Sequence, residues 1–380
     1  MFFNSPTGYN DPYEGIISVS IVDIFEAFLI VKSEMSPDSS ISLEEIETIF
    51  TFPKMFDNIG KSEDIQNVRI LLFDMLNKAL KYTHVSPEVA IYFTLFKDDD
   101  FLKLFPYISN ATLTISQYNN IVNQALSQNS TLSDYDKNSL LNFYTDRYEE
   151  KYKIVNSLRR NTSVVVPIYL VDAIHYTLFK QTTYEETLIA CNNLALETIE
   201  NARQLPGKSF KTTCLSENPT SVLMWAHYAN QHTGFCIEYD FNNAIGTSFP
   251  LERLAKVNYS SNMTEMKIES LVQIMRKKLS PNFVKDPDIT QLTVETCLEA
   301  IITKNLAWQY EKEWRIILDN FSGIKIDKIP YVTKIIVGVN IAEKHKQELL
   351  KFANEKNPPI PVYQAFLLPN KYEIGYYQIS

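Results

Sequence analysis

The sequence predicts an α+β protein, with a largely helical N-terminal half and a C-terminal region of mixed β-sheet and short helices. Up to about residue 205 the apolar residues recur at helical spacing, whereas from about residue 209 short β-branched and aromatic runs alternate with short helical stretches. A chain of 380 residues with 45% hydrophobic residues can form two domains around substantial cores. We expect an NDP-turn segment, 1–15, that packs on the C-terminal region, a mainly helical region, 16–205, and a mixed α/β region, 206–380, that carries the candidate site.

Two helices stand out in the N-terminal half. Ile70–Leu80 is an amphipathic run, and Tyr184–Leu205 is a second one with acidic residues in its first turn, where they favour a helix start. Asn161–Leu170 is rich in β-branched residues, but Pro167 restricts it to an edge strand or a linker.

The C-terminal region is predicted to contain strands separated by short helices. Four strands are expected, at Phe210–Leu215, Phe235–Tyr239, Trp314–Leu318 and Thr333–Val339. The alternation in the second strand predicts that Phe235, Ile237 and Tyr239 point inward.

A helix is expected between the first two of these strands, at Thr220–His232. Asn218 is a suitable N-cap, and Pro219 suits the first helical position. Gly234 lies where a left-handed residue ends many helices.

Composition and net charge indicate the cellular compartment and argue against some classes of binding partner. The net charge of −9 and the pI near 5.2 argue against duplex nucleic acid as a partner, because neutralising phosphates requires a basic surface. The four cysteines form no CxxC pair, which favours a reducing cytoplasm. The apolar stretch Ile16–Val31 contains Asp23 and Glu26 and is too short to span a membrane. We therefore expect a cytoplasmic protein without a membrane partner.

Known phosphate-binding and metal-binding patterns are missing from the sequence. There is no GxGxxG or GxxxxGK[ST] among its 9 glycines. His227 and His232 are five residues apart, so one helical face does not present both, and no metal site is expected.

The candidate site combines an aromatic segment with a late acidic pair. Glu311, Glu313 and Arg315 alternate, so they share one face if Tyr310–Leu318 is a strand, with the two carboxylates roughly 6.5–7 Å apart along it. Mutual repulsion would raise the pKa of one glutamate, and the arginine would neutralise the other. The alternative is a solvated strand face with a surface ion pair worth about 0–1 kcal/mol. For the aromatic segment around Trp225, the alternative is a buried core helix.

Four segments carry a family resemblance. They are GYNDPYEG at 8–15, CLSENPTSVLMWAHYANQHTGFCIEYD at 214–240, WQYEKEWRI at 308–316 and KIIVGVNI at 334–341. Together they resemble the domain of unknown function 2971 family of bacterial proteins, whose name implies no chemistry.

The order of these segments also resembles the ADP-ribosyltransferase arrangement. That arrangement has a serine-bearing strand, an aromatic-rich helix and a late Glu-x-Glu strand, and it implies NAD as a nucleotide substrate. By position, Glu313 would stabilise an oxocarbenium-like transition state, and Glu311 would orient the acceptor. Ser216 would lie near the nicotinamide ribose, with Tyr228 or Trp225 as the stacking wall. Further candidate binding residues are His227, Arg315, Asn10 and Asp11.

The leading hypothesis is therefore an NAD-dependent ADP-ribosyltransferase-like enzyme in bacterial phage defence or conflict, acting on an unidentified acceptor macromolecule. Whether the chain is an enzyme stays open, because the resemblance implies a first strand before the NDP turn and only Met1–Tyr9 precedes Asn10. One alternative is a binding or effector module of the same fold without turnover. Another is a hydrolase of glycosidic or N-glycosidic bonds that uses the carboxylate pair.

Overall fold

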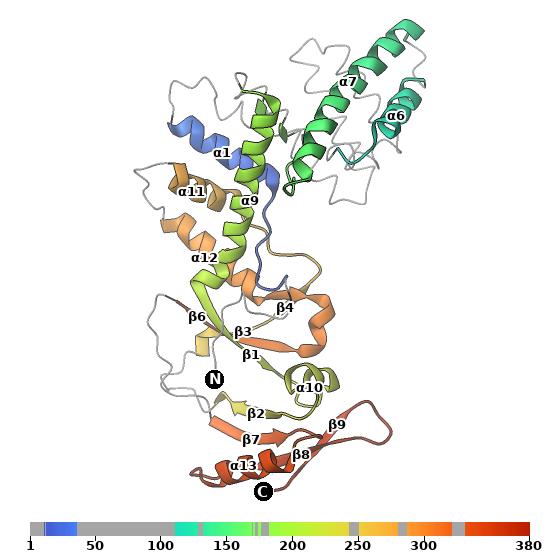
Figure 1. The fold of residues 1–380 in the computed structure, drawn as a ribbon. Coiled ribbons are helices and arrows are strands. Elements are labelled where there is room, and N and C mark those ends of the chain that lie inside the picture. Colours follow the sequence, from blue (N-terminus) through green and yellow to red (C-terminus); the bar gives the residue numbers. More distant parts are fainter. Residues whose placement is uncertain are drawn as a thin grey trace. The chain divides into compact units, whose positions relative to one another are not determined.

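The computed structural model describes residues 11, 13–35, 111–127, 132–168, 170–171, 174–175, 182–242, 251–279, 287–320 and 331–380 (Figure 1). Helices dominate the N-terminal half and sheets the C-terminal region, which confirms the predicted α+β class. The expected helix Ile70–Leu80 and the candidate residue Asn10 lie outside the described residues.

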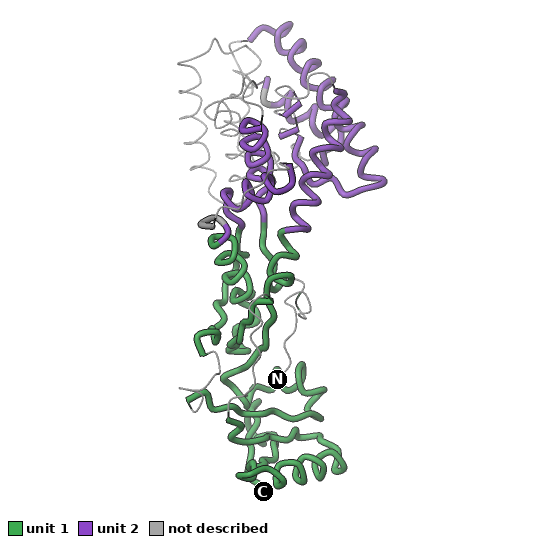
Figure 2. Tube along the Cα trace, turned by 90° about the vertical axis from the view of Figure 1, so that its left-hand side faces the viewer, with its two compact units in different colours: residues 1–18, 202–265, 291–380 green, residues 19–201, 266–290 purple. Residues whose placement is uncertain are grey.

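Two compact units divide the chain, and Figure 2 colours them separately. Unit 1 consists of Met1–Ser18, Ala202–Glu265 and Gln291–Ser380, so it joins the N-terminal segment to the C-terminal region. Unit 2 consists of Val19–Asn201 together with a C-terminal contribution, Met266–Thr290. Every candidate site residue that the structure describes belongs to unit 1.

Unit 2 is helical in its described part. Its elements are α1 (Ile21–Met35), α6 (Ile115–Ser127), α7 (Asp134–Arg159), most of α9 (Tyr184–Ser209) and α11 (Ile268–Leu279). Helix α1 packs against α11, and α6 packs against α7. In the second pair, the rings of Tyr118 and Tyr148 stack with their centroids 4.0 Å apart.

The start of α9 explains why its helical prediction is confirmed. Thr183 and Glu186 form a capping box: the Thr183 hydroxyl accepts from the Glu186 backbone at 3.2 Å, and the Glu186 carboxylate accepts from the Thr183 backbone at 2.8 Å. The helix continues past Pro206 to Ser209, four residues beyond the predicted end.

The predicted edge strand or linker at Asn161–Leu170 does not form a strand. Its backbone is irregular up to Pro167, and the described residues after the proline are helical. The Pro167 carbonyl accepts hydrogen bonds from the backbones of Leu170 and Val171, both at 3.2 Å. Proline suits the first turn of a helix because its missing N–H would have no helical partner there.

The described part of unit 1 contains three sheets. The first has the order β1 (Phe210–Ser216), β6 (Glu313–Asp319), β3 (Leu254–Lys256), and all its pairs are antiparallel. The second has the order β2 (Phe235–Asp240), β7 (Tyr331–Val337), β8 (Val362–Leu367), β9 (Ile374–Gln378). The third is the parallel pair β4 (Asn258–Ser260) and β5 (Thr303–Asn305). The four predicted strands are confirmed with small shifts at their ends.

The four-stranded sheet lies between two helices, α10 (Val222–Tyr228) and α13 (Glu343–Asn354) (Figure 1). On one face, Trp225 of α10 packs with Ile336 of β7 and with β8 and β9. On the other, Ile335 and Val337 pack against α13. Because side chains alternate along a strand, β7 contributes to two small hydrophobic cores on opposite faces of the sheet.

The inward face of β2 was predicted wrongly. Cys236 packs on the Trp225 side, whereas Phe235 and Ile237 are exposed. Residues opposite each other in an antiparallel pair share a face, and Phe235 and Ile237 lie opposite Val337 and Ile335. They therefore point to the α13 side, but β2 is the edge strand and α13 packs over β7 and β8.

Helix α10 is shorter than predicted at both ends. Ser221 caps it by accepting from the Met224 backbone, whereas Asn218 closes a turn with Thr220. The helix ends at Tyr228 because Asn230, Gln231 and His232 have positive φ values of 46°, 54° and 68°. Consecutive left-handed residues cannot continue a right-handed helix.

Candidate functional site

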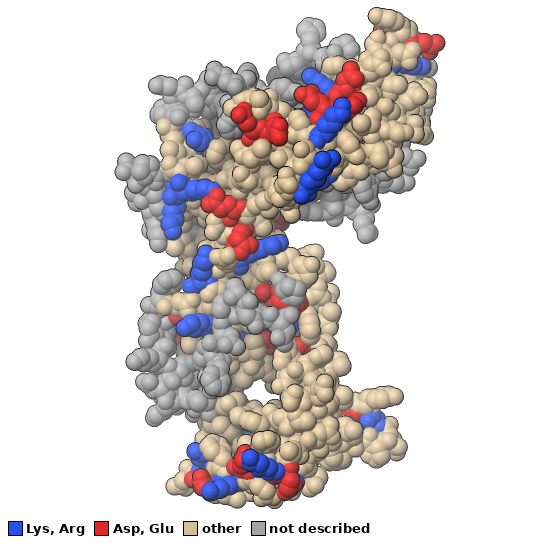
Figure 3. Space-filling model, viewed as in Figure 1, with Lys and Arg blue, Asp and Glu red and all other residues tan. Residues whose placement is uncertain are grey.

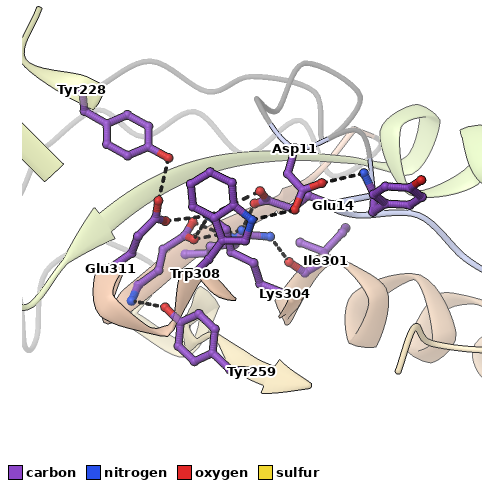
Figure 4. A network of polar contacts seen from close by, with 11 residues as sticks. Asp11, Glu14, Tyr228, Tyr259, Ile301, Lys304, Trp308 and Glu311 are labelled. Carbon is purple, nitrogen blue, oxygen red and sulfur yellow. Dashed lines mark hydrogen bonds and ion pairs between the residues drawn. The ribbon is translucent and has the colours of Figure 1, made fainter. Parts of the chain in front are cut away.

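Five charged side chains meet in the interior of unit 1. They are Glu14, Lys304, Glu311, Glu313 and Arg315, which we call the ionic cluster (Figure 4). All five residues are buried, and Arg315 is 0% exposed. This burial contradicts the alternative of a solvated strand face, and it means that each charge must be compensated inside the protein.

The local backbone explains how the acidic pair comes together. After α12 (Pro287–Ile302) and β5, the chain forms a 3₁₀ helix, η4 (Leu306–Glu311), whose first turn is capped by the Asn305 side chain. Lys312 is left-handed, with φ 46°, and reverses the chain before β6. The predicted strand from Tyr310 was therefore wrong in its first three residues, and Glu311 reaches the cluster from η4 rather than from a strand.

Lys304 links all three carboxylates. Its Nζ donates to Glu311 Oε2 at 2.6 Å and to Glu313 Oε2 at 3.0 Å, and it lies 3.3 Å from Glu14 Oε2. Because one ammonium bridges Glu311 and Glu313, their bridged oxygens lie no farther apart than the sum of the first two distances. One buried cation therefore pairs with both members of the acidic pair at once.

Arg315 holds Glu313 through two hydrogen bonds. Its Nε donates to Oε1 at 2.8 Å and its second terminal nitrogen donates to Oε2 at 3.1 Å. The guanidinium also donates to Glu14 and to the Ile301 carbonyl. The planar fork of arginine suits this two-point pairing, which fixes the orientation of the Glu313 carboxylate.

The cluster shifts the pKa values of its members in opposite directions. Burial raises the pKa of Glu14 more than the charges of Arg315 and Lys304 lower it. Burial also acts to raise the pKa of Glu313, but the hydrogen bond and charge of Arg315, with Lys304, outweigh it and lower this pKa. Burial would lower the pKa of Lys304, but the negative charges around it raise it. Glu313 and Lys304 are thus held ionised.

Three aromatic side chains border the cluster, and we call them the aromatic rim: His227, Tyr228 and Trp308. Tyr228, which is 50% exposed, donates its hydroxyl to Glu311 Oε1 at 2.9 Å. Desolvation and this hydrogen bond raise the pKa of the Tyr228 hydroxyl. His227 is exposed, and its ring centroid lies 6.4 Å from those of both Tyr228 and Trp308. The Lys304 ammonium lies 5.2 Å from the Trp308 ring centroid.

The NDP-turn segment reaches the same region. Asp11 Oδ2 accepts from the Trp308 indole at 2.8 Å, and Glu14 joins the ionic cluster three residues later (Figure 4). Of the two predicted binding residues in this turn, Asp11 therefore touches the aromatic rim. Asn10 falls outside the described residues.

Two other predicted residues take structural positions. Trp225 is buried against β7, β8 and β9, and its indole donates to the Pro219 carbonyl at 2.7 Å. Ser216 donates to the Glu311 backbone carbonyl at 2.6 Å and accepts from the Asn218 backbone. Ser216 thus fixes the backbone that carries Glu311, whereas Trp225 belongs to the core.

The sequence reasoning missed Lys304, Glu14 and Tyr259. The Tyr259 hydroxyl accepts from the Glu313 backbone at 2.8 Å and so fixes the start of β6. Both charged residues have a signal in the sequence. Glu14 lies within the quoted GYNDPYEG segment, and Lys304 begins the segment that leads into the Glu-x-Glu motif. A buried acidic pair requires a cation, and Lys304 is the basic residue that most closely precedes it.

The family model described as "Protein of unknown function (DUF2971)" matches residues 224–316. This match confirms the predicted family for the segment that carries the aromatic rim together with Lys304, Glu311, Glu313 and Arg315. No curated protein and no solved structure matches the chain. The family description names no activity, so the chemistry rests on the residues themselves.

Three further properties complete the description. On the face in Figure 3, basic and acidic side chains of the described residues are interspersed, without a broad area of one sign. Among the described helices, none is both long and apolar enough to cross a membrane. In the same part of the chain, no group of three His, Cys, Asp or Glu side chains is arranged to hold a metal ion.

Proposed function

We propose that the ionic cluster and the aromatic rim of unit 1 form an NAD-dependent ADP-ribosyltransferase-like active site. The observation that carries the proposal is the hydrogen bond from the half-exposed Tyr228 to the buried Glu311, which Lys304 joins to Glu313. A solvent-facing aromatic ring thereby contacts a carboxylate pair that is shielded from water. Shielding strengthens the attraction between a fixed carboxylate and a developing positive charge.

The reaction requires a stabiliser of positive charge. The bond between ribose C1′ and the nicotinamide nitrogen breaks, its electron pair leaves with neutral nicotinamide, and C1′ becomes oxocarbenium-like. A nucleophile of the acceptor then bonds to C1′ and loses its proton. In this proposal Glu313 opposes the positive charge, and Arg315 keeps it ionised and oriented. Glu311 and Tyr228 face the incoming ring.

The substrate would approach from the side of the aromatic rim. His227 and Tyr228 are exposed, whereas the Glu313 side chain is only 5% exposed. Access to the carboxylates therefore requires the Tyr228 hydroxyl to leave Glu311. Rotation of an exposed aromatic side chain is a small change compared with opening the sheet.

One observation favours a second candidate, a binding or effector module without turnover. Lys304 and Arg315 already form ion pairs with Glu311 and Glu313. Buried networks whose charges are paired within the protein also occur as structural elements. The hydrolase alternative has less support. Lys304 occupies the space between the carboxylates, where a glycosidase places the sugar or the attacking water.

The test is release of nicotinamide from NAD by the full chain. The transferase proposal expects release by the unaltered protein and a loss of about a hundredfold or more in Glu313→Gln. Because this substitution perturbs a buried network, Tyr228→Ala is the second variant, since it removes one half-exposed aromatic ring. Tyr331→Ala is the matched control, because Tyr331 is 49% exposed and lies on β7 outside the cluster.

The outcomes separate the two candidates. Loss of release in Tyr228→Ala but not in Tyr331→Ala, with both variants folded, supports the transferase. NAD binding without release supports the binding module. A protein that neither binds nor cleaves NAD contradicts both proposals for this site.

A further inference from the structure

A cavity of about 610 Å³ lies in unit 1 beside the four-stranded sheet. It is lined by the start of α10, by the turn at His232, by the residues after β7, and by the loop that joins β8 to β9. None of its lining residues belongs to the ionic cluster or to the aromatic rim. Its size lies within the range of small-molecule sites in proteins.

The wall at His232 is held in a strained conformation. His232 is the third consecutive left-handed residue, with φ 68°, and such backbone is costly for a residue other than glycine. Two hydrogen bonds hold it in place: Asn340 donates to the His232 carbonyl at 3.0 Å, and Gly338 donates to the Gly234 carbonyl at 2.8 Å. Gly338 is required at this contact, because a side chain there would collide with the His232 carbonyl.

The strained turn presents an unused polar atom. His232 Nδ1 is buried and has no hydrogen-bond partner among the described residues. A buried polar atom without a partner costs free energy, so native structures rarely leave one unless a ligand or water completes it. Backbone strain and a buried ring nitrogen without a partner therefore occur together in a residue that lines the cavity, and strain of this kind clusters at functional sites.

The β8–β9 loop supplies an aromatic ring and charges of both signs to the lining. It contributes Lys371, Tyr372 and Glu373, and the Tyr372 side chain is fully exposed. A large aromatic side chain that is exposed beside a cavity is available to close over a ligand. Val222 and Val339 supply apolar surface to the same cavity.

These groups match the parts of a nucleotide. An asparagine amide such as that of Asn340 pairs with the donor and acceptor on the edge of adenine, and tyrosine stacks on the face of a base. A lysine ammonium binds phosphate as a point charge. A glutamate such as Glu373 is a common partner of ribose hydroxyls.

We propose that this cavity binds a purine nucleoside monophosphate, at a site separate from the ionic cluster. Tyr372 covers the base, Asn340 and His232 contact its polar edge, and Lys371 pairs with the phosphate. The proposal does not depend on the transferase activity, because it concerns binding alone and uses none of the carboxylates of the ionic cluster.

Calorimetric titration of the full chain with AMP tests the proposal. We expect one saturable site and weaker binding of UMP, which presents a different edge. Tyr372→Ala should weaken AMP binding about tenfold or more, because it removes a stacking ring. The control is Tyr377→Ala, a half-exposed tyrosine of β9 outside the cavity lining, which should leave the affinity unchanged.

Two further comparisons locate the ligand. Lys371→Ala should weaken AMP binding and leave adenosine binding unchanged, because adenosine lacks the phosphate. Tyr228→Phe should not affect AMP binding. The proposal is overturned by the absence of saturable AMP binding, by equal affinity for UMP, or by an effect of Tyr228→Phe without one of Tyr372→Ala. The last pattern would place AMP at the aromatic rim instead.

Discussion

Removing the lysine of the ionic cluster should destabilise unit 1 far more than removing an exposed lysine. Lys304→Met keeps most of the side-chain volume but removes the one cationic partner that Glu311 has among the described residues. Glu311 is 2% exposed, so its carboxylate would remain buried, and within the described part of the chain the Tyr228 hydroxyl alone would still hydrogen-bond to it. Glu313 would retain Arg315.

The expected loss of unfolding free energy in Lys304→Met follows from the burial of the Glu311 carboxylate, which keeps its charge when the lysine is removed. Breaking a buried ion pair by removing one partner costs about 3–5 kcal/mol, because a charge stays uncompensated in the interior. The matched control is Lys256→Met, which also lies in unit 1. Its ammonium lies 3.0 Å from Glu217, but the two side chains are 57% and 41% exposed, and exposed pairs contribute about 0–1 kcal/mol. Short contact distance alone therefore predicts no difference, whereas burial predicts a gap of several kcal/mol.

Tryptophan fluorescence in a urea titration measures the effect selectively. The three tryptophans of the chain, Trp225, Trp308 and Trp314, all belong to unit 1, so the signal reports its unfolding. In a double-mutant cycle, adding Glu311→Gln to Lys304→Met should recover part of the loss, because it removes the uncompensated charge. A loss below about 1 kcal/mol in Lys304→Met, or no recovery in the double variant, would refute the reasoning.

Three further experiments test other parts of the description. At pH 7, Glu14→Gln should cost less unfolding free energy than Glu313→Gln, because folding raises the pKa of Glu14 and lowers that of Glu313. Glu313 stabilises above its unfolded pKa and loses this effect as pH falls through its folded pKa, so urea titrations at decreasing pH should show the gap closing. Gly338→Ala should lower the urea midpoint more than Gly375→Ala, because the new methyl meets a backbone carbonyl at the first site and the Phe366 ring, which can move, at the second. Thr183→Ala should cost about 1 kcal/mol by removing half of a capping box, measured by far-ultraviolet circular dichroism because unit 2 lacks tryptophan.

The strands could be predicted from the sequence because their signals are local. Each lies in a short β-branched or aromatic run, and each formed within a few residues of its predicted bounds. The choice of inward face is not local. For β2 the inward face depends on how the strand pairs with β7 and on its position at the sheet edge. The sequence therefore predicted that side chains alternate along β2, but not which of the two sets faces the core.

The ends of α10 and the composition of the site show a second limit. Asn218, Pro219 and Gly234 are typical of the ends of a longer helix than the one observed. In the structure, Ser221 is the N-cap, and three left-handed residues end the helix early. In the site, the convergence of Glu311, Glu313 and Arg315 was predicted from their spacing. Their burial was not, because it depends on Lys304 and Glu14, which arrive from separate segments. Long-range partners decide whether a charged motif is a surface pair or a buried network.

The charge balance of the ionic cluster leads to a last prediction about its ligand. Three carboxyl groups face two cationic side chains, and the aromatic rim presents Tyr228 and His227 to solvent beside them. Both aromatic faces and excess carboxylate attract a planar cation. The nicotinamide ring is positively charged in NAD and neutral in NADH, and the two molecules share the rest of their structure.

A ligand that binds only the folded protein raises its stability by an amount set by concentration and Kd. NAD should therefore raise the Tm of unit 1, followed by tryptophan fluorescence, more than NADH does at equal concentration. The difference should fall in Tyr228→Ala, which removes the aromatic face, and persist in Tyr331→Ala. Equal shifts with NAD and NADH would mean that the nicotinamide charge is not recognised at the aromatic rim. The transferase proposal would then lose its main physical support, because the same carboxylates that attract the ring cation must oppose the oxocarbenium charge.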